Sequence, residues 1–134
     1  MGEYGFKKLV VWKNTQKLRK LIYEMTKKFP KSEMRRISQM RDAARSVKQN
    51  IQEGYMSSSI GIYIRSLSIS EGSLGELSGD VEDCLEDNLI SKEEFFEADS
   101  LCGKTDYLLK RLIRSLEIKR EGRAKKQCRR PNKE

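Results

Sequence analysis

Basic side chains recur at spacings that suit the binding of a chain of phosphates. Three lysines spaced i, i+4, i+7 share one face of a predicted helix, and two arginines and a lysine repeat that spacing in the next segment. With two arginines between these segments, the candidate nucleic-acid-binding residues are Lys13, Lys17, Lys20, Arg35, Arg36, Arg41, Arg45 and Lys48. Lysine and arginine bind phosphate oxygens without reading base sequence. Exposed lysines are also ordinary on soluble helices, so the arginines, whose planar fork suits phosphate or carboxylate, carry more of this prediction.

The sequence lacks the side chains that most enzymes and metal sites need. It has no histidine, which removes the commonest general base, the commonest metal ligand and every nucleophile paired with histidine. Its three cysteines, Cys84, Cys102 and Cys128, are too widely spaced to form a four-ligand zinc site. The glycines at 72, 75 and 79 follow no predicted strand and match no phosphate-binding loop. We therefore expect no catalytic residue, no metal site and no cofactor.

Charge is segregated along the chain. Residues 7–48 hold 14 Lys/Arg against 3 Asp/Glu, residues 71–99 hold 11 Asp/Glu against one lysine, and residues 119–134 hold 8 Lys/Arg against 2 Glu. The carboxylates around Val81 flank the apolar stripe, which predicts a solvated or partner-facing surface rather than a metal site. Such a chain can bind a polyanion, pair with copies of itself, or neutralise its charges within one bundle. All three interpretations remain open.

Apolar residues recur at helical spacing in four segments, which predicts an all-α protein. The expected helices cover about residues 9–29, 38–53, 59–88 and 92–120. Pro30 ends the first helix, and Ser38 is the expected N-cap of the second. Gly54 is expected to end the second helix in a left-handed conformation. Short connections favour an antiparallel up-down-up-down four-helix bundle.

Two local patterns in the second half of the chain bear on the third and fourth helices. Ser91 and Glu94 form a capping box at the start of the fourth helix. Glycines at 72, 75 and 79 interrupt the third segment, but its apolar period continues through them, so one helix is expected, with a kink near Gly72 as the alternative. Small residues at this spacing would let a neighbouring helix approach. After Arg120 the apolar pattern ends, which assigns residues 1–118 to the bundle and 119–134 to a basic, disordered tail.

Size and cysteine content indicate one domain in a reducing compartment. The chain has 134 residues, the length of a single domain with one core. Its beginning lacks the apolar run of a secretory signal, and no stretch approaches the ~20 apolar residues of a membrane span. The cysteines are therefore expected to be reduced thiols in the cytoplasm.

Several motifs occur together as they do in a known family. Residues 39–54 read QMRDAARSVKQNIQEG, and residues 67–77 read LSISEGSLGEL. With LVVW at residues 9–12 and the Phe29–Pro30 pair, they resemble the bacterial four-helix-bundle proteins named for 23S rRNA intervening sequences. That family is similar in turn to the accessory variability proteins of diversity-generating retroelements. The resemblance covers about residues 6–118.

The resemblance implies an antiparallel four-helix protomer, a ring-shaped homopentamer and a basic surface suited to RNA or DNA. In the retroelement relatives the partner is a reverse transcriptase. The resemblance also implies a structural or interfacial role for Asn50, Glu53, Gly54, Gly72, Ser73 and Glu76. The chain departs from the family pattern at Asp42, where a second basic residue is common, and at Ser70, where alanine is usual. Asp42 lowers the local positive charge.

Two classes of function fit these observations. The first is a non-enzymatic, oligomeric nucleic-acid-binding accessory protein, as the basic rows and the resemblance indicate. The second is a structural or adaptor oligomer that binds a protein partner without nucleic acid. The scattered aromatic residues form no stacking platform, so the first class predicts weak base specificity and a steep dependence on salt.

Overall fold

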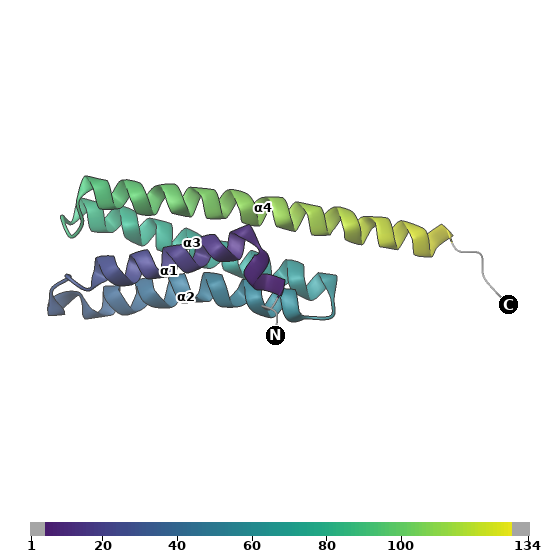
Figure 1. Cartoon of the computed structure of the whole chain (residues 1–134), viewed down its shortest axis with the longest axis horizontal. Coiled ribbons are helices and arrows are strands. Elements are labelled where there is room, and N and C mark those ends of the chain that lie inside the picture. The colour runs from purple at the N-terminus through teal and green to yellow at the C-terminus, as the bar shows by residue number, and fades with distance from the viewer. Residues whose placement is uncertain (1–4, 130–134) are drawn as a thin grey trace.

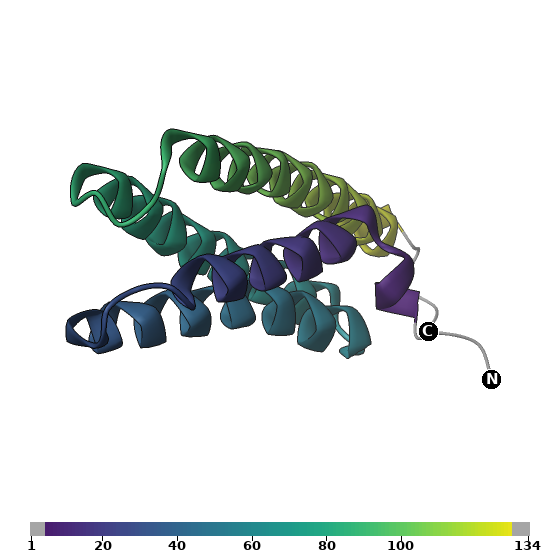
Figure 2. The ribbon, with the colours of Figure 1, turned by 60° about the vertical axis from the view of Figure 1, so that its left-hand side comes forward.

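Four α-helices and two short 3-10 helices make up the regular structure of the described residues. The computed structural model describes residues 5–129, and within that range it contains helices and no strand. The elements are η1 (Gly5–Lys8), α1 (Val10–Thr26), η2 (Lys31–Glu33), α2 (Met34–Met56), α3 (Ile60–Glu86) and α4 (Lys92–Arg129). The chain turns back at each short connection, and α1 lies beside both α2 and α4 (Figure 1, Figure 2). The all-α prediction is confirmed.

One apolar core runs through the middle of the bundle. Each helix contributes side chains that are almost completely inaccessible to water, among them Leu18, Ile22, Met40, Ile51, Leu67, Leu77 and Leu109. These residues fall in the apolar stripes that the sequence predicts. Burial of each such side chain contributes roughly 1.5–3 kcal/mol, so the stripes rather than local helix propensity hold the bundle together.

The boundaries of α2 differ from those expected at both ends. The helix begins at Met34, directly after the 3-10 turn η2, so Ser38 lies inside it and is not its N-cap. Gly54 also lies inside α2, which runs on to Met56, and no described glycine has a positive φ. A Cβ on Gly54 would lie 2.8 Å from Tyr63 Cδ1 and 2.9 Å from Ser66 Cβ. Glycine is required there because α3 packs against its backbone, not because the chain turns.

The helix α3 runs without interruption through its three glycines. Its buried face, which includes Leu67, Leu74, Leu77 and Val81, is unbroken, and this packing outweighs the cost of the glycines. A Cβ built on the glycine at 72, 75 or 79 would meet no atom within 4 Å. The prediction that these glycines allow another helix of the same chain to approach closely is therefore wrong, because a side chain at these positions would face open space.

The helix α4 confirms one local prediction and corrects another. The Ser91 hydroxyl accepts a hydrogen bond from the Glu94 N–H at 3.1 Å, and the Glu94 carboxylate accepts one from the Ser91 N–H at 3.0 Å, as in a capping box. The helix then continues to Arg129, past the turn between α2 and α3 (Figure 1). Residues 119–129 are thus helical rather than a disordered tail, because Lys, Arg, Ala and Gln extend an existing helix readily. Residues 130–134 lie outside the described range.

Candidate nucleic-acid interface

Cationic side chains gather where α1 lies against α2. A hollow of about 220 Å³ between the two helices is lined by Arg19, Tyr23, Arg41, Asp42 and Arg45. Arg41 donates a hydrogen bond to the Thr26 hydroxyl at 3.0 Å, and its guanidinium carbon lies 4.2 Å from the centre of the Tyr23 ring. These neutral partners fix the position of the guanidinium without cancelling its charge. Arg41 therefore presents an oriented cation beside the hollow.

Lys48 extends this group of cations along α2. Burial lowers the pKa of its amine, and repulsion from Arg19, Arg45 and Lys7 lowers it further. A lysine pKa that falls for these reasons indicates a local excess of positive charge, which a bound anion would relieve. We call the group formed by Arg19, Arg41, Arg45 and Lys48 the α1–α2 surface.

Ion pairing within the chain leaves this surface free. The ion pairs among the described residues involve Arg36 but none of the other seven candidate cations. Arg36 lies 2.8 Å from the Asp87 carboxylate and 3.0 Å from that of Glu33. The hydrogen bond to Asp87, with smaller contributions from Cys84 and Glu33, raises the pKa of Arg36. Arg36 thus joins α2 to the end of α3, and its predicted role in phosphate binding is not supported by its surroundings.

The remaining candidates are spread over two other regions. Lys13, Lys17 and Lys20 are exposed along α1, and Lys17 borders a groove between α1 and α4. Arg35 is exposed at the start of α2, in a hollow that also contains Asp80 and Asp83. Ten residues of helix separate Arg35 from Arg45, or roughly 15 Å, so the structure does not bring it into the α1–α2 surface.

Arg19 is the functional candidate that sequence reasoning missed. It lies between Lys17 and Lys20 in the sequence, but it shares the hollow with Arg41 and Arg45 rather than the outer lysine face. Its position one residue after the buried Leu18 is the signal that could have identified it, because a residue next to the core stripe lies beside the neighbouring helix.

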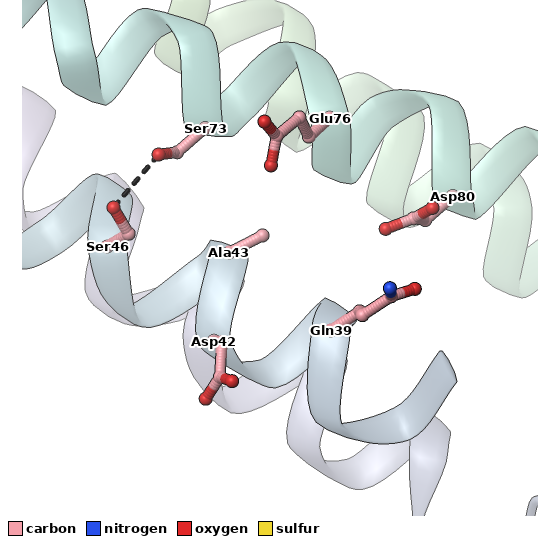
Figure 3. Close-up of a pocket in the computed structure, with 7 residues that line it drawn as sticks. All are labelled: Gln39, Asp42, Ala43, Ser46, Ser73, Glu76 and Asp80. Atoms are coloured by element: carbon pink, nitrogen blue, oxygen red, sulfur yellow. Dashed lines mark hydrogen bonds between the residues drawn. The ribbon is translucent and has the colours of Figure 1, made fainter. Parts of the chain in front are cut away.

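The opposite flank of α2 is acidic. A groove of about 550 Å³ between α2 and α3 is lined by Gln39, Asp42, Ala43, Ser46, Ser73, Glu76 and Asp80 (Figure 3). Glu76 and Asp80 extend from α3 toward α2, whereas the Asp42 side chain points away from α3 (Figure 3) and also lines the hollow between α1 and α2; none of the seven residues is basic. Burial raises the pKa of Asp80, and the neighbouring Asp83 and Glu76 raise it further, against the opposing effect of Arg36. We call this feature the α2–α3 groove.

Residues expected at a structural or subunit interface divide into two groups. The Ser46 and Ser73 hydroxyls share a hydrogen bond of 2.9 Å across the groove (Figure 3), and the Asn50 amide donates to the Ser46 carbonyl at 2.9 Å. Ser73 and Gly54 therefore serve the packing of α2 on α3 within one chain, whereas Asn50 binds Ser46 inside α2. The remaining three, Glu53, Gly72 and Glu76, are exposed.

Cysteines, metal ligands and membrane-spanning helices are the other features that could form a site among the described residues. Cys84 and Cys102 are buried free thiols, whereas the side chain of Cys128 lies outside the described part of the chain. Burial, with a contribution from Asp99, raises the pKa of Cys102 to about 12. Among the described residues, no group of three or more possible ligands is placed to hold a metal ion. None of the described helices is long and apolar enough to span a membrane.

The described residues thus form four α-helices without strands, with a cationic surface between α1 and α2 and an acidic groove between α2 and α3. The sequence profile described as 23S rRNA-intervening sequence protein matches residues 7–130, and the chain therefore belongs to this family. A solved structure of a protein with unknown function, from the S23 ribosomal protein family of Bacteroides thetaiotaomicron, has the same fold, with a TM-score of 0.73. It is 19% identical, and the match covers 78% of this chain and 96% of that one. A search of curated protein sequences gives no significant match.

Proposed function

We propose that this protein is a cytoplasmic, non-enzymatic accessory protein that binds RNA or DNA through the phosphates held on its α1–α2 surface. The observation that carries the proposal is a set of close cations, Arg19, Arg41, Arg45 and Lys48, which form no ion pair among the described residues although Asp42 also lines the hollow. A phosphate backbone would neutralise them and release its own counterions. Membership of a family named for an insert in ribosomal RNA supports the same conclusion.

Binding of this kind would depend on charge more than on base sequence. Among the described residues that line the hollow, Tyr23 alone is aromatic, and Arg41 lies 4.2 Å from the centre of its ring, so the hollow offers no row of rings on which successive bases could stack. Backbone contacts from Lys and Arg position a nucleic acid without identifying it. We therefore propose weak base specificity and a strong dependence of affinity on salt.

A charge-reversal experiment tests this proposal. Arg19→Glu with Arg45→Glu removes two cations that have no structural carboxylate partner, and leaves the Arg41 contacts to Thr26 and Tyr23 intact. The matched control is Arg65→Glu with Lys92→Glu, which changes net charge equally at exposed sites elsewhere. At about 100 mM salt, RNA affinity measured by fluorescence anisotropy should fall at least about tenfold in the first variant and less than about threefold in the control. Equal losses, or none, with unchanged helicity by circular dichroism, would remove the proposal.

The proposal also includes the assembly of the protein into an oligomer. The resemblance to accessory variability proteins supports a ring-shaped homopentamer of antiparallel up-down-up-down protomers that assists a reverse transcriptase. Opposite charges on the two flanks of α2 would favour contacts between unlike faces of neighbouring copies. Contacts of this heterologous kind generate rings when the rotation closes.

An adaptor role is the second candidate, and the α2–α3 groove is the observation that favours it. Its carboxylates would suit a basic segment of a protein partner as well as a neighbouring copy. This alternative predicts an oligomer that binds no nucleic acid at any salt concentration. The anisotropy experiment on the unmodified chain separates the two candidates.

A further inference from the structure

The inward stripe of α4 changes its chemistry where the helix leaves the bundle. Within the bundle, the stripe steps by 4, 3, 4, 3 and 4 residues through Ala98, Cys102, Thr105, Leu109, Leu112 and Leu116. The first four are buried and the last two are partly buried. Continued with steps of 3, 4 and 3, the same register places Lys119, Arg123 and Lys126 on this face. We call these three residues the cationic stripe.

The cationic stripe lies on a part of α4 that has no helix beside it. At about 1.5 Å per residue, α4 with 38 residues is roughly 57 Å long, against roughly 40 Å for α3 with 27 residues. Figure 1 shows the excess length extending past the turn that joins α2 to α3. Every residue from Ile118 to Gln127 is exposed. The stripe therefore points into the open space next to the end of the bundle, on the side where its apolar predecessors meet the core.

The chemistry of the stripe argues against another helix as its occupant. A helix packed in this register would have to bury three cations, and burial of unpaired charge is strongly unfavourable. None of the three has an ion pair among the described residues. The acidic residues nearby, Glu117 and Glu121, fall on the other side of the helix by the same 100° rotation per residue. The occupant that fits is a polyanion.

We propose that the cationic stripe is a second phosphate-binding surface, which holds the backbone of a nucleic acid against the end of the bundle. This inference rests on the proposed function and adds a contact site to it. The three cations span about 10 Å of a rigid helix, a length over which duplex DNA presents several phosphates, since it carries one charge per roughly 1.7 Å. Glutamine, lysine and arginine have similar helix propensities, so the stripe can be neutralised without melting the helix.

Two variants of equal charge test the position of this surface. The first is Lys119→Gln, Arg123→Gln and Lys126→Gln. The control is Arg111→Gln, Arg114→Gln and Lys125→Gln, which removes three exposed cations from other faces of α4. Affinity for a duplex RNA and for a duplex DNA of the same sequence is measured for the unmodified chain and both variants. We expect a loss of at least about tenfold in the stripe variant and less than about threefold in the control.

The outcomes separate this inference from the proposed function. Equal losses in the two variants would mean that only net charge matters, and no loss in the stripe variant would mean that the stripe touches no phosphate; either result overturns the inference. If Arg19→Glu with Arg45→Glu still weakens binding in that case, the proposed function stands without the stripe. If the unmodified chain binds neither duplex, both fail. Circular dichroism of each variant serves to check that helicity is retained.

Discussion

At the scale of single residues, a missing methyl group allows α2 and α3 to approach each other at Gly54. Alanine favours a helix over glycine by about 1 kcal/mol, but its Cβ would lie 2.8 Å from the Tyr63 ring and 2.9 Å from Ser66 Cβ. Overpacking of this kind costs about 1–3 kcal/mol. We expect Gly54→Ala to lower the free energy of unfolding, measured by urea denaturation.

Gly75 provides the matched control for that substitution. A Cβ at Gly75 meets no atom within 4 Å, so Gly75→Ala should raise the free energy of unfolding by up to about 1 kcal/mol. A stabilised Gly54→Ala variant would show that α3 can move away at little cost. Our explanation for the glycine would then be wrong.

The buried thiol of Cys102 predicts how stability depends on alkaline pH. Its pKa is raised to about 12 in the folded protein, whereas an exposed thiol ionises near about pH 8.5. The unfolded chain therefore loses this proton first, and the free energy of unfolding should be constant below about pH 8.5 and fall as pH rises toward about 12. Urea denaturation at several pH values measures this loss.

Cys102→Ala separates the thiol from other alkaline effects. Burial also raises the pKa of Tyr63 to about 12, so some loss of stability above about pH 10 should persist in the variant. The loss between about pH 8.5 and 10 should become smaller. An unchanged profile would show that Cys102 ionises equally in the folded and unfolded chain.

At the scale of the helix, the start of α4 is held by two reciprocal hydrogen bonds between Ser91 and Glu94. Ser91→Ala removes the hydroxyl that accepts from the Glu94 N–H, and should lower the free energy of unfolding by about 1 kcal/mol. Ser100→Ala, at an exposed position inside the same helix, should change it by less than about 0.5 kcal/mol. Chemical denaturation of both variants measures the difference, and equal effects would argue against the cap.

The existence of the helices could be predicted from the sequence, whereas their ends could not. Apolar residues at helical spacing identify the buried faces, since burial itself selects them. The local sequence does not distinguish a glycine in a close helix contact, such as Gly54, from one in a C-terminal turn, or a serine inside a helix, such as Ser38, from an N-cap. The extent of α4 could not be predicted either, because the loss of apolar residues after Arg120 ends the packing but not the helix.

The sequence predicts the part of the candidate site that lies on one helix, but not the part that depends on contacts between helices. Spacing along one helix placed Arg41, Arg45 and Lys48 together, because that relation depends only on helix geometry. It could not show that Arg19 of α1 faces them, or that Arg36 meets Asp87 of the α3–α4 connection. Both facts depend on how two helices are rotated against each other, which the packing of the whole bundle determines.

At the scale of the whole molecule, positive and negative side chains gather on different surfaces of the described chain. Pairs such as Lys28 with Glu94 and Arg36 with Asp87 neutralise part of the acidic end within the chain. The α2–α3 groove and the α1–α2 surface keep their opposite charges. We therefore expect an oligomer at about 50 mM salt that dissociates partly at about 500 mM, as sedimentation velocity would show, because screening shortens the range of the attraction. Glu76→Gln with Asp80→Asn should dissociate it further, and a monomer at every salt concentration would contradict this arrangement.

The salt dependence of binding tests the central account most directly. Each cation that contacts a phosphate of B-form DNA contributes about −0.9 to the slope of log K against log salt concentration. The four cations of the α1–α2 surface alone therefore predict a slope of about −4 or steeper for a DNA duplex, and Arg19→Glu with Arg45→Glu should make it shallower by about 2. A slope near zero, or one that the double variant leaves unchanged, would contradict the account.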